Sequence, residues 1–346
     1  MPRNPSVRLS RSSSSLGAGG GPGKNSEDDE MGLWTAGGLI VAATIGWSSY
    51  APHVVLAHRL TYATSSISLP YPAFTHQFHL RALHHEAKLI DSHARRLRQP
   101  LNLLHPGVLA HTAQAWAQSV VELVTAAVCS PSSDASQLRR LGAKALGLLL
   151  GSLASFPFFI AQNRLFAQLA GEVTVLPLKY TGLGQTLSSI NYADTFRYAF
   201  IPHLLTSVVS DAIYSYYSPR EETIANWIYR KLPPFKSRSK KVNKTKRLIA
   251  SAASNILFSV LGDLVLSPLY VVSTTMAIQG SGLEVALGTP RYSSGLHCAE
   301  DIFVRHGPLA FWQGLVPVLY SELVPQAMAT TFTALVFNAF AYLREE

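Results

Sequence analysis

The chain has 346 residues, of which 48% are hydrophobic and only 14% are charged, whereas soluble domains carry about 25% charged residues. The mean hydropathy of +0.17 argues against an ordinary soluble globular protein, and a membrane protein is favoured because the apolar residues fall into long blocks. The formal net charge is +9. One segment, between Arg230 and Arg247, holds nine basic residues and no acid and so accounts for the whole excess of positive charge.

Residues 1–30 are rich in serine and glycine and end in an acidic patch. Such a segment has too little apolar surface to form a core, so we predict a solvated tail. Arg3, Arg8 and Arg11 stand among serines, which leaves a mitochondrial transit peptide as an alternative, although no amphipathic apolar face accompanies them.

Six apolar blocks follow the tail, and each can supply the roughly 20 residues that a membrane-spanning helix needs. We therefore predict an all-α membrane protein with six transmembrane helices. The blocks cover residues 32–58, 106–130, 141–170, 194–217, 248–279 and 309–343.

The first, third and fifth blocks align on Pro52, Pro157 and Pro268, at spacings of 105 and 111 residues. A tyrosine follows the second and third of these prolines, at Tyr180 and Tyr292. An internal period of this length indicates tandem repeats of one helical unit. The predicted divisions are a tail over 1–30, a degenerate first repeat over 31–130, a second repeat over 138–218, a basic loop over 219–247 and a third repeat over 248–346.

These repeats resemble the mitochondrial carrier family, which places a proline in each odd helix and an aromatic–basic–glycine turn before each even helix. The third repeat matches best, and the resemblance extends over residues 32–343. It implies six transmembrane helices in three tandem carrier-type repeats, with short amphipathic helices between the odd and even helices. The matching residues are Pro268, Tyr292, Gly295, Asp301, His306, Gly307, Trp312, Gln313, Gly314 and Pro317.

The chain departs from the family pattern at the positions that carry its charged gate. Solute carriers have an acid two residues after the proline and a base five residues after it, and the resulting ion pairs close one side of the cavity. Because the gate positions here are neutral, alternating-access transport is doubtful. The acid positions hold Val54, Phe159 and Tyr270, and the base positions hold Ala57, Gln162 and Ser273.

These departures resemble a non-transporting outer-membrane branch, the mitochondrial carrier homolog proteins. Short matches support this resemblance around Pro157 and Arg164 in the second repeat and around Met276 in the third. It implies an insertase or docking scaffold for α-helical, tail-anchored membrane proteins in the mitochondrial outer membrane. The alternatives are an atypical solute transporter of the inner membrane and a scaffold for mitochondrial fusion or dynamics. One feature argues against the preferred branch, because residues 309–343 supply a full sixth helix that could close a lateral groove.

Polar side chains within the apolar blocks are the candidate functional residues, since ionisable groups at membrane depth are costly. Asp211 and Asp263 are the strongest groove candidates, because no basic residue of their own blocks neutralises them. Interhelical ion pairs are the alternative, and Arg59 and Arg164 share one repeat position that a structural role also explains. The predicted groove residues are Arg59, Glu122, Arg164, Asp211, Asp263 and Glu322, with Pro52, Pro157, Pro268 and Gly314 as repeat-motif residues.

The basic segment contains Pro233 and Pro234, which predict a loop. Its charge could attract anionic lipids or acidic clients, but we favour a role in orienting the chain in the membrane.

The histidine-rich stretch over 76–93 is interpreted as an amphipathic surface helix packing through Phe78, Leu80, Leu83, Ala87 and Ile90, not as a metal site. We predict no cofactor, no metal, no enzymatic activity and no nucleic-acid partner; the predicted partners are membrane lipids, helical clients or dynamics factors.

Overall fold

The computed structural model describes residues 55, 77–102, 104–129, 137–170, 179–232, 240–286, 289–320 and 323. Within these ranges the chain forms α-helices and short 3-10 helices, and they contain no strand. Two compact units are distinguished. The first comprises Met1–Trp47, Ser218–Ser259 and Glu322–Glu346, and the second comprises Ser48–Tyr217 and Val260–Ser321.

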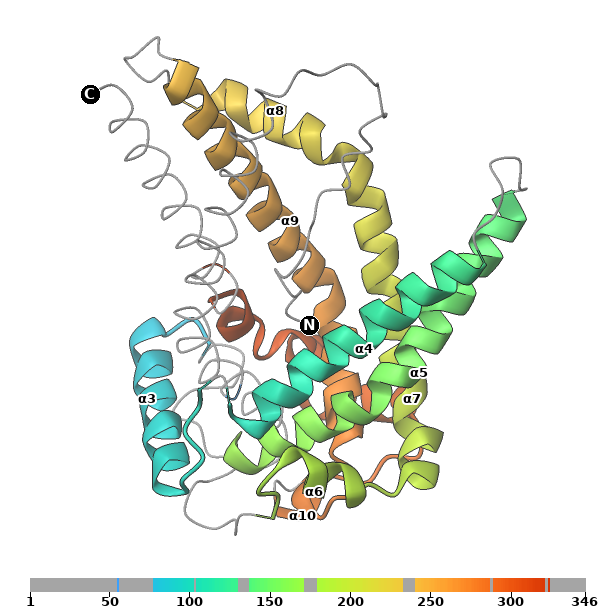
Figure 1. The fold of residues 1–346 in the computed structure, drawn as a ribbon. Coiled ribbons are helices and arrows are strands. Elements are labelled where there is room, and N and C mark those ends of the chain that lie inside the picture. The colour runs from blue at the N-terminus through green and yellow to red at the C-terminus, as the bar shows by residue number, and fades with distance from the viewer. Residues whose placement is uncertain are drawn as a thin grey trace. The chain divides into compact units, whose positions relative to one another are not determined.

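The second unit holds most of the described helices, which Figure 1 shows in chain order. It combines long helices with several short ones. Its elements are α3 (Leu80–Arg96), α4 (Pro106–Val128), α5 (Gln137–Ala170), α6 (Leu183–Ser188), α7 (Tyr192–Tyr217), the C-terminal part of α9 (Lys240–Ala277), α10 (Leu283–Ala286), α11 (Gly295–His306) and the 3-10 helix η2 (Pro308–Trp312).

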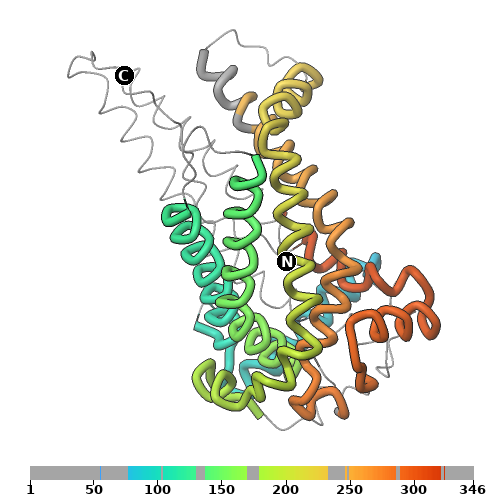
Figure 2. Tube along the Cα trace, turned by 90° about the vertical axis from the view of Figure 1, so that its right-hand side faces the viewer, coloured from blue at the N-terminus to red at the C-terminus, as the bar shows by residue number. Residues whose placement is uncertain are grey.

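Helices α4 and α5 pack antiparallel along their lengths (Figures 1 and 2). Near the start of α4, Gly107 lies so close to the Phe166 ring that a Cβ atom there would be 2.8 Å from Cε1. Near the other end, Gly147 of α5 faces Thr125 of α4. Glycine lets two helix backbones approach closely, and this is the form of helix contact that membrane bundles favour.

Two described helices are long and apolar enough to cross a membrane, over Gln137–Leu169 in α5 and Ile249–Ala277 in α9. Pro157 and Pro268 lie inside these helices, as predicted for the odd-numbered positions. Of the block at 32–58 only residue 55 is described, and the block at 309–343 is described only over 309–320 and at 323. A membrane-compatible all-helical chain is therefore supported, and six spanning helices in three repeats stay a prediction.

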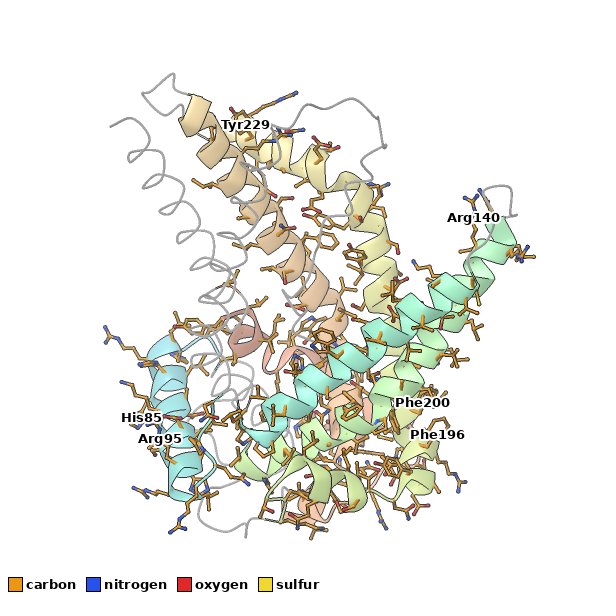
Figure 3. All side chains as sticks on the ribbon, viewed as in Figure 1. His85, Arg95, Arg140, Phe196, Phe200 and Tyr229 are labelled. Carbon is orange, nitrogen blue, oxygen red and sulfur yellow. The ribbon has the colours of Figure 1, made fainter. Side chains whose placement is uncertain are left out.

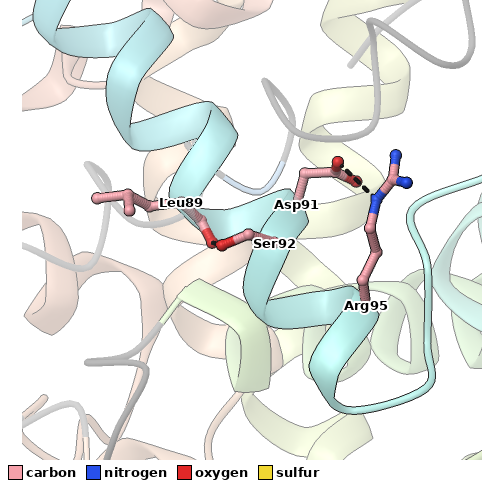
Figure 4. A network of polar contacts seen from close by, with 4 residues as sticks. All are labelled: Leu89, Asp91, Ser92 and Arg95. Carbon is pink, nitrogen blue, oxygen red and sulfur yellow. Dashed lines mark hydrogen bonds and ion pairs between the residues drawn. The ribbon is translucent and has the colours of Figure 1, made fainter.

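Helix α3 is the amphipathic helix predicted from the histidine-rich stretch. Leu83, Ala87 and Ile90 are buried on one face. Phe78 and Leu80, expected to pack on the same face, are instead 58% and 62% exposed, because they lie before or at the first residue of the helix. Figure 4 shows the exposed side of α3, where Arg95 Nε lies 2.9 Å from Asp91 Oδ2 and Ser92 Oγ donates to the Leu89 carbonyl.

In the first unit, the segment 219–247 differs from the predicted loop. After a 3-10 turn over Ser218–Arg220, helix α8 runs over Glu221–Lys231, and α9 begins at Lys240, eight residues before the predicted block. Proline disfavours helix at the residue before it, so Pro233 and Pro234 end only the local helix. The acids in the first turn of α8 and the bases in its last turn complement the helix dipole and stabilise it.

Candidate functional site

The polar interior of the second unit is arranged along helix α5. On its α7 side, Ser155 Oγ lies 3.2 Å from His203 Nε2, and both side chains are buried. On its α4 side, Gln162 Oε1 lies 3.2 Å from His111 Nδ1. A buried polar group is costly without a hydrogen-bond partner, so these pairs allow α5 to carry polar side chains inside an apolar bundle.

Aromatic rings surround the His203 contact. Phe159 stacks on His203 with ring centroids 4.4 Å apart. Phe196 and Phe200, labelled in Figure 3, stack on each other along α7 and both meet Phe156 edge-on. These arrangements are the offset and edge-to-face geometries that aromatic pairs prefer. They fix the spacing of α5 and α7 where the neutral histidine pair lies.

Arg164 joins three helices and has a side chain that is fully buried. Its Nη2 donates to the Gln279 carbonyl at 3.0 Å and to Thr195 Oγ1 of α7 at 3.4 Å. Its Nε donates to the Ala277 carbonyl at 3.4 Å. The guanidinium therefore occupies the C-terminal end of α9, where the helix dipole favours a positive charge and the last carbonyls need donors. This geometry assigns Arg164 a structural role.

Eleven residues after Pro157 and eleven after Pro268 stands a glutamine that binds the backbone of the following tyrosine. Gln168 donates from Nε2 to the Tyr180 carbonyl at 2.8 Å and accepts from the Tyr180 N–H at 3.0 Å. Gln279, with its amide oriented to satisfy both groups, donates to the Tyr292 carbonyl at 3.1 Å and accepts from its N–H at 3.0 Å. The second and third predicted repeats thus share one backbone clamp.

A second polar cluster lies toward the other end of α5. Lys144 Nζ is 2.7 Å from Asp211 Oδ2 of α7 and 2.5 Å from Ser215 Oγ. Glu122 of α4 interacts electrostatically with both charges and accepts from Gln118 Nε2 at 3.0 Å. The Lys144 and Asp211 side chains are 46% and 26% exposed. We call Glu122, Lys144 and Asp211 the charged notch; it places two acids and one base on the partly open surface of three helices.

The predicted groove residues do not form one continuous groove. Glu122 and Asp211 meet in the charged notch, whereas Arg164 lies twenty residues further along α5 than Lys144, about 30 Å away at the rise of an α-helix. Asp263 lies buried on α9. Arg59, Glu322 and the motif residue Pro52 lie outside the described residues. Asp211 was predicted to lack a neutralising partner because its own block holds no base. That reason was insufficient, because Lys144 of another helix, α5, forms an ion pair with it.

Two sets of residues escaped the sequence analysis. Lys144 was missed, although it is an ionisable group within the predicted 141–170 block and the rule used for the other candidates applies to it. The glutamine clamp was missed as well, although aligning the repeats on Pro157 and Pro268 places Gln168 and Gln279 in register. Of the motif residues, Gly314 has a φ of +83°, a conformation that glycine adopts without strain.

Outside the membrane-compatible helices, burial shifts the pKa of several groups, including His105, Tyr292 and Cys298. It lowers the pKa of His105, at the start of α4, to about 4. It raises the pKa of Cys298 in α11 to about 12, with the Asp301 charge adding to the effect. It also raises the pKa of Tyr292, whose hydroxyl donates to Asp301 Oδ2 at 2.8 Å. Among the described residues, no three histidine, cysteine or acidic side chains gather as a metal site.

Comparison with known proteins identifies the C-terminal part of the chain. Residues 241–341 match the family model described as mitochondrial carrier protein. The match covers most of the third predicted repeat, where the sequence resemblance was strongest, and supports membership of the mitochondrial carrier family. Together with the apolar helices it indicates a mitochondrial membrane protein. No curated protein matches the chain.

Proposed function

We propose that this protein is a non-transporting, carrier-like protein of the mitochondrial outer membrane that acts as an insertase or docking scaffold for tail-anchored, α-helical membrane proteins. It is proposed to work without enzymatic activity and without a cofactor. The observation that carries the proposal is the chemistry of the gate positions, which are neutral and already engaged in local contacts.

The described gate positions favour a static bundle. Phe159 stacks on His203, and Gln162 pairs with His111. Ser273 Oγ donates to the Tyr270 carbonyl of its own helix at 3.1 Å. A transporter gate needs charge pairs that form on one side of the cavity and break when it opens, so that two states are close in energy. Neutral contacts of this kind offer no such pair.

The charged notch supports the client-binding half of the proposal. An inserting helix must bring its polar end groups past hydrocarbon, where a charged side chain costs at least about 2.5 kcal/mol. Lys144 and Asp211 are only partly buried, so they present a polar surface beside apolar helices. Such a surface lowers the cost of passage for polar groups of a client.

The test uses the full chain in phosphatidylcholine vesicles with a purified reporter that carries one C-terminal apolar helix and a C-terminal tag. Protection of the tag from external protease measures insertion. We expect several-fold more protection than in empty vesicles, reduced by the double substitution Lys144→Met/Asp211→Leu and kept by the charge swap Lys144→Asp/Asp211→Lys. The matched control is Arg95→Met/Asp91→Leu, which removes an exposed ion pair of α3.

Insertion equal to that of empty vesicles would overturn the proposal. The same vesicles are tested for uptake of labelled nucleotides and dicarboxylates, and saturable uptake would favour the inner-membrane transporter instead. Protease treatment of intact mitochondria carrying an N-terminally tagged chain tests the location. Loss of the tag supports the outer membrane, whereas protection until that membrane is ruptured contradicts it.

A further inference from the structure

Helix α8 lies between two apolar helices, α7 and α9, in the order of the chain. It follows α7, whose apolar sequence ends at Tyr217, and the candidate span of α9 begins at Ile249. A hydrophilic connection between two apolar helices cannot enter hydrocarbon, because its charged groups are too costly there. For the charged helix α8 and the first turns of α9, we therefore infer a position next to the lipid headgroups.

The side chains of α8 are distributed as in a helix that lies flat in the membrane interface. Ile224, Trp227 and Ile228 share one face at the spacing of a helical turn. The Trp227 side chain is 59% exposed, although tryptophan is a large apolar residue. Amphipathic helices with tryptophan and basic residues bind in the plane of the interface, where the indole ring is both apolar and able to donate a hydrogen bond.

Positive charge gathers at the C-terminal end of α8. Arg230 and Lys231 occupy its last turn and are exposed, whereas its two acids, Glu221 and Glu222, occupy the first turn. The N-terminal part of α9 adds two more basic residues, Lys246 and Arg247. We call Arg230, Lys231, Lys246 and Arg247 the α8 cationic surface.

Two contacts join α9 to α8 within this unit. Lys246 Nζ lies 4.5 Å from the centroid of the Tyr229 ring, a cation–π distance. Arg247 Nη2 lies 3.2 Å from Glu222 Oε1, with both side chains largely exposed. Exposed pairs of this kind contribute little binding energy, so the arginine stays available to a second anion. The contacts place Lys246 at the C-terminal end of α8, where Arg230 follows Tyr229, and Arg247 at its first turn, so bases of α9 lie along the length of α8.

We propose that the α8 cationic surface binds the phosphate headgroups of anionic phospholipids, with Trp227 inserted at the interface beside them. Phosphate is the complementary ligand, because Arg and Lys donate charge-assisted hydrogen bonds to its oxygens. Basic residues close to an anionic membrane each add to the attraction, and the effect falls off with salt. The proposal rests on the membrane location of the chain and is independent of client insertion.

The experiment measures which lipids contact Trp227. The full chain and its Trp227→Phe variant are reconstituted in phosphatidylcholine bilayers with an equal small fraction of brominated phosphatidylglycerol or brominated phosphatidylcholine. The fluorescence difference between the two proteins isolates Trp227 from the other four tryptophans. We expect brominated phosphatidylglycerol to be enriched about fivefold at Trp227, and the enrichment to disappear at high salt.

The variant Arg230→Gln/Lys231→Gln/Lys246→Gln/Arg247→Gln should lose this enrichment. The matched control removes the same number of charges from exposed positions of α3, through Arg81→Gln/Lys88→Gln/Arg95→Gln/Arg96→Gln, and should keep it. Thermal unfolding checks that both variants fold. Equal quenching by the two brominated lipids, or an enrichment that survives loss of the four charges, would overturn the proposal.

Two further outcomes separate this proposal from its competitors. Protease accessibility of an N-terminal tag reports the orientation of each variant in the bilayer. A quadruple variant that inverts its orientation and keeps its lipid preference shows an orientation determinant only, which overturns lipid binding. If the full chain inserts no client but keeps its preference for the anionic lipid, the proposed insertase function is contradicted. Phospholipid binding by the α8 cationic surface is then still supported.

Discussion

The side-chain amide of Gln168 forms a two-point hydrogen-bonded pair with the backbone of Tyr180, at 2.8 Å to the carbonyl and 3.0 Å from the N–H. Gln99 adds a weaker bond to the same carbonyl at 3.3 Å. Tyr180, the tyrosine of the second predicted repeat, is therefore a fixed attachment point for the chain that leaves the long helix.

Replacing Gln168 with leucine should destabilise the protein, because the buried Tyr180 N–H loses its partner while the carbonyl keeps Gln99. We expect a loss of about 1–3 kcal/mol, seen as a melting temperature several degrees lower in detergent. Gln279→Leu should have a similar effect through Tyr292. Gln137→Leu, at an exposed position of α5, is the control. Unchanged melting of both clamp variants would show that the clamps contribute nothing.

Replacing Arg164 with lysine should also destabilise the bundle, although the charge is kept. A lysine ammonium is a single point and cannot reach the Ala277 carbonyl, the Gln279 carbonyl and Thr195 together as the planar guanidinium does. We expect a cost of about 2–4 kcal/mol by thermal or chemical unfolding. The exposed Arg96→Lys is the control, and wild-type stability of Arg164→Lys would contradict the assigned role.

Stability should fall between about pH 6.5 and pH 4 through His105. Its pKa is about 4 in the folded protein and about 6.5 in an unfolded chain, so the unfolded state binds the proton at higher pH. The stabilisation is complete above the unfolded value and is lost as the pH falls, with a limit of about 3 kcal/mol.

His105→Asn isolates this effect. His105 Nδ1 accepts from the Gly107 N–H at 3.1 Å, and an asparagine oxygen can keep that helix cap without titrating. The variant should lose less stability than wild type between pH 7.5 and pH 5. His85→Asn on the exposed face of α3 (Figure 3) is the control. Identical pH profiles for wild type and His105→Asn would disprove the prediction.

The two cysteines should differ strongly in reactivity. Cys298 is buried and its pKa is raised to about 12, whereas Cys129 is partly exposed. Since the thiolate is the reactive form, Cys298 should react with maleimide at pH 7.5 at least about a thousandfold more slowly than an ordinary thiol. Cys129→Ser should therefore leave the native protein almost unlabelled until denaturant is added. Rapid labelling of that variant would contradict the burial of α11 against its neighbours.

The pattern of apolar blocks predicted the class of the protein and the placement of its long helices. The expected block at 141–170 corresponds to α5, that at 194–217 to α7 and that at 106–130 to α4. The carrier family match at 241–341 falls on the third predicted repeat, and the threefold repeat itself stays a prediction. These features are local or periodic, and a helix that faces lipid requires a run of apolar residues wherever it packs.

Helix ends were predicted less well. The two prolines at 233 and 234 suggested a loop throughout 219–247, but α8 ends just before them and α9 starts at Lys240. The effect of proline reaches only the residue before it and the turn that contains it. The charges at the ends of α8 complement its dipole, whereas the first turn of α9 holds lysines and no acid, so charge placement explains α8 but not the start of α9.

Residue spacing and composition were enough to predict a helical, apolar chain, and its C-terminal part matches the mitochondrial carrier family model. Which polar residues meet depends on how the helices pack. Lys144 neutralises Asp211 from another helix, and Arg164 caps the end of α9. The reason is geometric: a charge within an apolar block must find a partner, but the partner lies on whichever helix the packing brings alongside, and no spacing along the chain encodes that choice.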